Sequence, residues 1–256
     1  MTPGKPNSRQ WTVRYGLIAY GASWIFVAVA SLGTTVLFGV HLGAAGALWF
    51  DLAWIASLIP LRRAGQLRAV DLGLRTTPAA RAFALTMLVF LVLTLLDAIW
   101  QMGLGVAPAI NPFAGIAAKS AALIVLTGVA AVLTPVVEEV FFRGLLYRSF
   151  RNRFSVLWSS LANGVMFALV HGEYALAILP ELAAAGVLLC LLYEYTGSLW
   201  PGITLSLFLD VGGFEQALTG HVGIVYLGVV VLVFILMARG LRGSSGGGFP
   251  PPALSG

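Results

Sequence analysis

The stretch TPVVEEVFFRGLLY, residues 134–147, puts two adjacent glutamates and an arginine inside an apolar run that begins near Ala121. Ionisable side chains within a membrane span cost a few kcal/mol to insert and usually mark an ion pair, a pathway or a site. Glu139 and Arg143 are four residues apart with the glutamate first, the order that favours an ion pair on one face of a helix. The stretch therefore predicts a buried helix with one charged face.

The composition around this stretch is that of a polytopic membrane protein. Of the 256 residues, 59% are hydrophobic and 10% are charged, and the mean hydropathy is +0.93, whereas an average soluble domain is about 25% charged. A helix needs roughly 20 apolar residues to cross a bilayer. No alternating pattern of a membrane barrel is visible. We expect an all-α transmembrane bundle of about eight membrane-spanning helices, near residues 15–39, 43–61, 82–101, 118–149, 155–171, 174–196, 199–216 and 221–238.

Polar segments flank this bundle at both ends. Residues 1–12 predict a polar N-terminal tail, residues 13–240 a single transmembrane domain, and residues 241–256, rich in Gly, Ser and Pro, a disordered C-terminal tail. The first apolar segment is long for a signal-peptide core and no clear cleavage site follows it, so we expect it to be retained as a helix. The basic loop 62–81 is expected at the cytoplasmic interface.

The net charge of +5 indicates membrane topology and not nucleic-acid binding. If eight helices alternate in direction, the basic residues fall on one side, and the opposite loops carry almost none. The positive-inside rule then places both termini in the cytoplasm of a multi-pass protein, and a bacterial plasma membrane fits best. The basic residues concerned are Lys5, Arg9, Arg14, Arg62, Arg63, Arg68, Arg75, Arg81, Arg148, Arg151, Arg153, Arg239 and Arg242.

Glu138 is the candidate catalytic residue. It is turned by about 100° from Glu139 on an α-helix, so Arg143 is not expected to neutralise both glutamates. A carboxylate without its own cation in a low-dielectric environment suits a general acid or base. His171 and Asp210 are candidate partners at comparable depth. A rise of 1.5 Å per residue puts Glu138, His171 and Asp210 roughly 18, 24 and 17 Å from the cytoplasmic ends of their helices.

Each of these residues also has a structural interpretation. A Glu139–Arg143 pair can hold a helix in register without touching a substrate, and a lone histidine in a membrane helix is often a packing residue. Asp51 and Asp97 are expected in structural or interfacial roles, with Lys119 as one potential partner. It is the convergence of three polar groups from three helices that predicts an enclosed site.

Four segments resemble one family of membrane proteins. EEVFFR at 138–143 fits an EExxxR motif, FALVH at 167–171 fits FxxxH, and YEYTGSLWPGITLSLFLD at 193–210 and DLGLR at 71–75 are similar to further family segments. The order and spacing identify the chain as resembling the CPBP family, which comprises type II CAAX prenyl proteases and bacteriocin-processing proteins. The likeness covers a core at about 115–215.

This resemblance implies an intramembrane endopeptidase acting near the terminus of a membrane-anchored protein or peptide in the lipid bilayer. In the family picture, the residues corresponding to Glu138 and His171 activate a water molecule. A His and an Asn four residues apart on a later helix stabilise the oxyanion. Here those two positions hold Ser206 and Asp210, so the Ser206 hydroxyl would have to act as donor, and Glu138 and Asp210 could share a proton.

Two questions stay open at this point. Glu138, His171 and Asp210 could supply three zinc ligands, but with one imidazole this is an unusual set, so a metal-free glutamic mechanism is favoured and no cofactor is expected. The missing imidazole also allows a catalytically silent scaffold or peptide-immunity protein. A transporter or channel is the third alternative.

Overall fold

The computed structural model describes residues 12–39, 46–104, 113–171, 176–221, 223 and 228. Within these ranges every regular element is a helix, as expected, and the chain is a multi-pass helical membrane bundle. The elements are α1 (Val13–Phe38), α2 (Ala47–Arg63), α3 (Ala69–Leu72), α4 (Ala79–Leu104), α5 (Ala121–Glu138), the π-helix η3 (Glu139–Tyr147), α6 (Arg148–Arg151), α7 (Val156–Val170), α8 (Leu179–Thr196) and α9 (Trp200–Thr219), with short 3₁₀ turns η2 (Ile116–Ala118) and η4 (Leu176–Ile178).

Local sequence fixes where these helices begin and end. Thr12, Ser120 and Ser155 each accept a hydrogen bond from a backbone N–H three residues on, which caps the N-termini of α1, α5 and α7. Gly197 ends α8 in the left-handed region, at φ 64°, where a residue without Cβ is favoured. The boundaries therefore follow from ordinary capping chemistry.

Seven of the eight expected windows coincide with helices, and the eighth, 221–238, lies almost wholly outside the described residues. Among the described residues, four helices are long and apolar enough to cross a membrane, namely Val13–Leu37, Ala79–Gly103, Ala121–Arg151 and Leu176–Thr196. The expected number of about eight spans is not confirmed. Length is the reason for two of the windows, because α2 has 17 residues and α7 has 15. These helices reach only about 26 Å and 22 Å, short of the roughly 30 Å hydrocarbon core.

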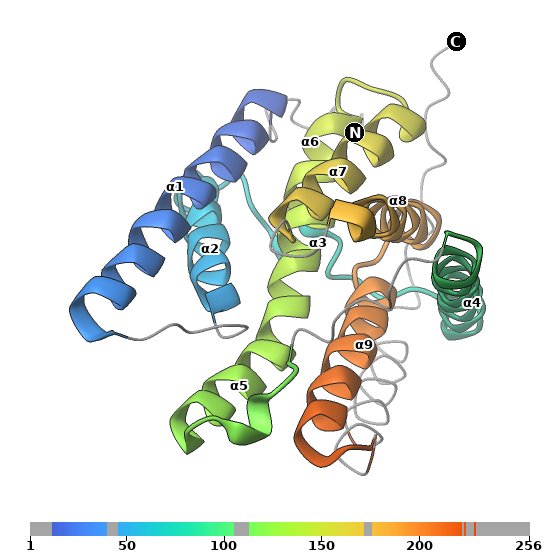
Figure 1. Cartoon of the computed structure of the whole chain (residues 1–256). Helices are drawn as coiled ribbons and strands as arrows, with labels where there is room; N and C mark the ends of the chain where they lie inside the picture. Colours follow the sequence, from blue (N-terminus) through green and yellow to red (C-terminus); the bar gives the residue numbers. More distant parts are fainter. Residues whose placement is uncertain are drawn as a thin grey trace, which may run out of the picture.

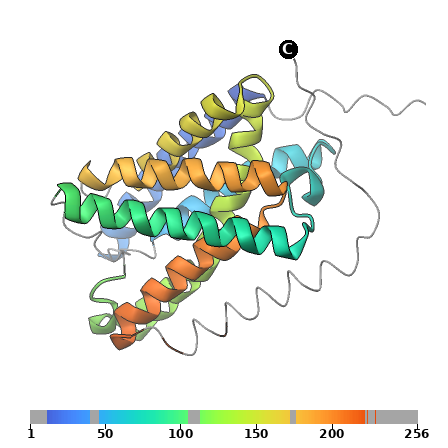
Figure 2. The ribbon, with the colours of Figure 1, turned by 90° about the vertical axis from the view of Figure 1, so that its right-hand side faces the viewer.

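The long helix formed by α5, η3 and α6 runs through the middle of the bundle (Figure 1). On one side α2 packs against α5, with α1 outside it, and on the other side α9 packs along α5. In the second view α4 and α8 lie side by side, and they contact one another (Figure 2). The charged stretch 134–147 is thus surrounded by other helices.

An aromatic cluster fixes the π-helix against its neighbours. The Trp54 ring of α2 stacks on Phe141 with centroids 5.0 Å apart, and Phe142 meets Phe167 of α7 edge-on at 5.2 Å. Such pairs contribute about 0.5–1.5 kcal/mol each beyond the burial of their area. Large apolar side chains on the outer faces of α1, α4 and α5 remain exposed, as expected for helices that face lipid.

The segment around α3 joins the turn between α8 and α9 to the rest of the bundle. The Leu199 N–H donates to Gly73 O at 2.9 Å, the Ser198 hydroxyl donates to Arg75 O at 2.6 Å, and Arg75 Nε donates to Gly197 O. A side chain at position 73 would collide with the Tyr193 ring, and φ is +96° there, so this close approach requires glycine. Through these bonds α3 holds the start of α9, the helix that carries two predicted site residues.

Candidate functional site

The two glutamates stand at a change of helix type. Glu138 is the last residue of α5, and Glu139 is the first of a nine-residue π-helix, where the sequence pattern predicted a continuous α-helix. Pro135 lies one turn earlier and has no N–H to donate, which removes one hydrogen bond of the α-helical ladder. π-helical turns are rare overall, and those that occur often lie at functional sites.

The ion pair expected between Glu139 and Arg143 is present and buried. Arg143 Nη1 lies 2.9 Å from Glu139 Oε1, and the two side chains are 0% and 1% exposed. The distance is that of an ion pair although the angle is not that of a hydrogen bond, so the attraction is mainly electrostatic. Arg143 also donates to Gly186 O at 3.4 Å, and its guanidinium lies 4.6 Å from the Phe167 ring centroid. Both charges are enclosed by neighbouring helices.

Glu138 faces a different neighbour from Glu139. His171 caps the C-terminus of α7, and its Nε2 atom lies 3.9 Å from Glu138 Oε1. The other ring nitrogen, Nδ1, is 2.9 Å from Phe167 O, and because a backbone carbonyl can only accept, Nδ1 carries the hydrogen. In the neutral ring Nε2 is then an acceptor directed at the Glu138 carboxyl.

Ser206 and Asp210 lie one turn apart on α9, which packs along α5. Both side chains are partly buried. The structure therefore brings Glu138 and His171 into a direct pair, and places Ser206 and Asp210 on the helix that packs beside Glu138.

The metal alternative would need three ligands around one ion. In the part of the chain that the structure describes, no three His, Cys, Asp or Glu side chains are placed as ligands of one ion. A zinc site needs three protein ligands and an open position. We therefore derive no step through a metal.

Asp51, which was expected from the sequence to have a structural or interfacial role, lies next to the site. It is 1% exposed on α2, and its Oδ2 accepts from the Thr134 hydroxyl at 2.7 Å, so the suggested partner Lys119 is not needed. Thr134 lies one turn before Glu138 on α5, so Asp51 borders the site. Its depth within the window 43–61 is the only sequence signal that could have placed it there.

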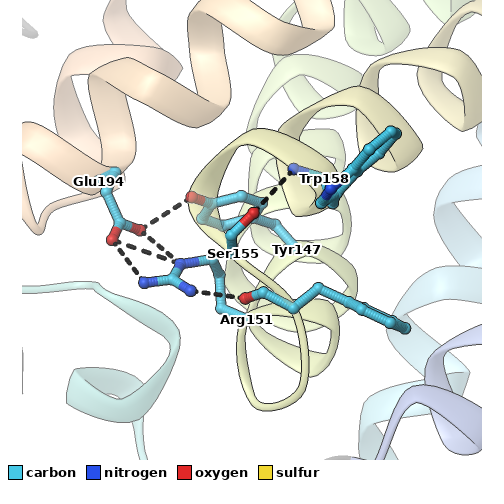
Figure 3. A network of polar contacts seen from close by, with 6 residues as sticks. Tyr147, Arg151, Ser155, Trp158 and Glu194 are labelled. Atoms are coloured by element: carbon cyan, nitrogen blue, oxygen red, sulfur yellow. Dashed lines mark hydrogen bonds and ion pairs between the residues drawn. The ribbon is translucent and has the colours of Figure 1, made fainter. Parts of the chain in front are cut away.

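A second polar network braces the far end of the π-helix (Figure 3). Glu194 of α8 accepts from the Tyr147 hydroxyl at 2.8 Å and pairs with Arg151 at 3.1 Å. Arg151 also donates to Phe154 O at 2.7 Å, just before the Ser155 cap of α7. This network links η3, α6 and α8 where the sequence analysis assigned no contacts.

A family model matches the central part of the chain. Residues 120–212, a little over a third of the chain, match a family model described as type II CAAX prenyl endopeptidase Rce1-like. The matched segment contains the Glu138–His171 pair and both α9 positions. The comparisons with curated proteins and with solved structures give no significant match.

Proposed function

We propose, from the match of residues 120–212 to the family model of Rce1-like type II CAAX prenyl endopeptidases, that the chain is an intramembrane endopeptidase of this kind. Its substrate would be a membrane-associated protein or peptide, cleaved near its terminus. The observation that carries the proposal is the pairing of Glu138 Oε1 with His171 Nε2 at 3.9 Å, with Nδ1 held by Phe167 O.

This geometry suits the binding of a water molecule. Two acceptors 3.9 Å apart do not bond to each other, but one water can donate a hydrogen to each at about 2.8 Å. The oxygen lone pairs then remain for attack on a peptide carbonyl. The Phe167 carbonyl fixes the imidazole tautomer and its orientation, as second partners of functional histidines do.

The reaction would then proceed by general base catalysis. As the water oxygen bonds to the carbonyl carbon, Glu138 accepts one of its protons. The resulting tetrahedral intermediate collapses when the same proton passes to the amide nitrogen and the C–N bond breaks. The products are a new carboxyl terminus and a new amine, so no co-reactant other than water is required.

Ser206 would supply the oxyanion donor on α9. A single donor of this kind contributes about 2.7–4 kcal/mol to transition-state stabilisation. Asp210, one turn further, could share a proton with Glu138 and donate when protonated. Glu139 and Arg143 would hold the π-helix, and do not face the attacking water in this proposal.

Replacement of a family histidine by Ser206 favours a second candidate function. A chain without efficient oxyanion stabilisation could act as a scaffold or immunity partner that binds a membrane peptide without cleaving it. Such a protein would keep its biological effect when Glu138 is replaced, whereas a peptidase would lose it.

The test is comparative peptidomics of membranes that contain the full-length protein or a variant. We expect Glu138→Ala and His171→Ala to abolish the same set of new termini while both variants still insert. Glu181→Gln, which replaces a glutamate in the first turn of α8, is the matched control and should leave those termini unchanged. Identical termini in wild type and Glu138→Ala would overturn the peptidase proposal and favour the silent one.

Localisation is proposed on the same footing. Basic loops on one side of the bundle favour a plasma membrane with both termini cytoplasmic. Epitope tags at the two termini should bind an added antibody only after the membrane has been permeabilised.

A further inference from the structure

A fully buried asparagine contacts the π-helix from the side. Asn163 lies within α7, is 0% exposed, and its Nδ2 donates to Phe142 O at 2.8 Å. Phe142 stands between the glutamate pair and Arg143 in the sequence. A side chain on α7 is thus bonded to the backbone of the segment that carries the charged motif.

The orientation of this amide is fixed by its second bond. The Cys190 thiol of α8 donates to Asn163 Oδ1 at 3.1 Å, and Cys190 is also 0% exposed. Phe142 O can only accept, so the amide nitrogen must face it and the amide oxygen must face the thiol. Cys190, expected from the sequence as a small packing residue, therefore completes a chain of bonds through three helices.

A bond to a helix carbonyl has a specific consequence in a π-helix. There each carbonyl pairs with the N–H five residues on instead of four, so a turn holds one residue more than in an α-helix. Reversion to α geometry would turn the residues on either side of Phe142 relative to each other. The hydrogen bond from the buried Asn163 amide to Phe142 O stabilises the π-helical arrangement. A change of helix type that broke this bond would leave the Asn163 amide unsatisfied.

The close packing of α7 on α8 keeps Asn163 in reach. A Cβ at Gly186 would lie 3.1 Å from Phe167 Cβ and closer still to Gly164 Cα, so both glycines are needed for this approach. Gly186 O is also the acceptor for Arg143. The same contact thus positions Asn163, Arg143 and the Phe167 carbonyl that orients His171.

We propose that Asn163, oriented by Cys190, is a positioning residue that holds the π-helix so that Glu138 faces His171 while Glu139 faces Arg143. This positioning role adds to the proposed peptidase function. Only its expected effect on turnover rests on that function. Asn163 touches no reacting atom and acts through the helix backbone.

The decisive experiment measures the Glu138–His171 relationship without using activity. The two residues are replaced together by cysteine, Glu138→Cys and His171→Cys, in the full-length protein, and joined with a short bifunctional methanethiosulfonate. Cys190→Ser keeps a donor to Asn163, whereas Cys190→Ala removes it, so these two backgrounds differ in that bond alone. We expect efficient cross-linking with Cys190→Ser and a several-fold lower yield with Cys190→Ala or with added Asn163→Leu.

Ser159→Ala is the matched control, because Ser159 is a fully buried polar residue of α7 that makes no hydrogen bond with the described residues. It should leave the yield unchanged. Equal yields in all backgrounds would overturn the positioning role, whether or not the protein proves to be a peptidase. If it is one, Asn163→Leu alone should lower kcat by about 10- to 100-fold with KM little changed, while Cys190→Ser should retain turnover. A loss confined to thermal stability would also overturn the proposal.

Discussion

The carboxylate of Glu139 lies directly against the α-carbon of Gly202 on α9. A Cβ at position 202 would come within 2.9 Å of Glu139 Cδ and closer still to Oε2. The buried ion pair of the π-helix is thus enclosed on this side by a residue that has no side chain. The fit between α9 and the long helix depends on that absence.

Gly202→Ala is therefore expected to destabilise the protein. Overpacking of this kind costs about 1–3 kcal/mol, and more if Glu139 is pushed away from Arg143. The midpoint of thermal or denaturant unfolding in detergent measures the loss. Gly33→Ala on α1, where the added methyl meets no atom within 4 Å, is the control and should be neutral or slightly stabilising. Equal midpoints for the two variants would contradict the packing argument.

The Glu139–Arg143 pair gives a prediction about single and double replacement. Removal of one member of a fully buried ion pair typically costs about 3–5 kcal/mol, because the other charge is left without compensation. We expect Arg143→Leu to destabilise strongly, and the double variant Glu139→Leu/Arg143→Leu to recover part of that loss. Unfolding of the wild type, Glu139→Leu, Arg143→Leu and the double variant in one detergent forms the required cycle. Additive losses would show that the two charges do not compensate each other.

Asp51 and Thr134 give a milder prediction. The Thr134 hydroxyl donates to Asp51 Oδ2 in a buried contact between α2 and α5. Asp51→Asn can keep an oxygen acceptor there, whereas Asp51→Ala leaves the hydroxyl unsatisfied at a cost of about 1–3 kcal/mol. Unfolding midpoints should rank wild type and Asp51→Asn above Asp51→Ala. The reverse order would mean that the hydroxyl finds another partner.

The short helix α3 gives a dependence of stability on pH. Arg68 pairs with Asp71 at 2.9 Å, and this hydrogen bond lowers the pKa of Asp71 below its usual value of 3.8. A lowered pKa in the folded state means that the unfolded chain binds the proton more readily. The contribution is thus fully present above pH 3.8 and is lost as the pH falls through the lower folded pKa.

The effect should be small and sensitive to salt, because Arg68 is 74% exposed. Hydrogen exchange of residues 68–75 between about pH 5 and pH 2.5, corrected for intrinsic rates, would follow it. Asp71→Asn should remove the acid-dependent part. A wild-type profile that matches this variant would contradict the assignment.

The sequence was sufficient for the parts of the fold that depend on composition and local spacing. Apolar windows placed seven helices, and a four-residue spacing predicted the Glu139–Arg143 pair, because helix formation and pairing on one face are local properties. The resemblance read from the segments at 138–143, 167–171 and 193–210 is confirmed by the family-model match over residues 120–212. These features need no knowledge of which helix packs on which.

The parts that depended on tertiary packing could not be predicted. The π-helix at Glu139–Tyr147 keeps the same residues as an α-helix would and differs only in hydrogen-bond register, which the surrounding helices determine. Asp51 reaches the site because α2 packs on α5, and Cys190 finds Asn163 because two glycines bring α7 and α8 together. None of these contacts has a spacing rule in the sequence.

Ser206 offers the sharpest prediction about turnover. If its hydroxyl donates to the oxyanion, Ser206→Ala should lower kcat by about 10²–10³-fold with KM little changed, because the interaction forms only in the transition state. Ser206→His introduces the imidazole of the family motif at the same position and should retain or raise kcat. The measurement is steady-state cleavage of whichever terminus the peptidomics identifies, with Thr94→Ala on the outer face of α4 as control. Full activity of Ser206→Ala would exclude the serine as the donor, and would direct the search to the neighbouring Asp210 on the same face of α9.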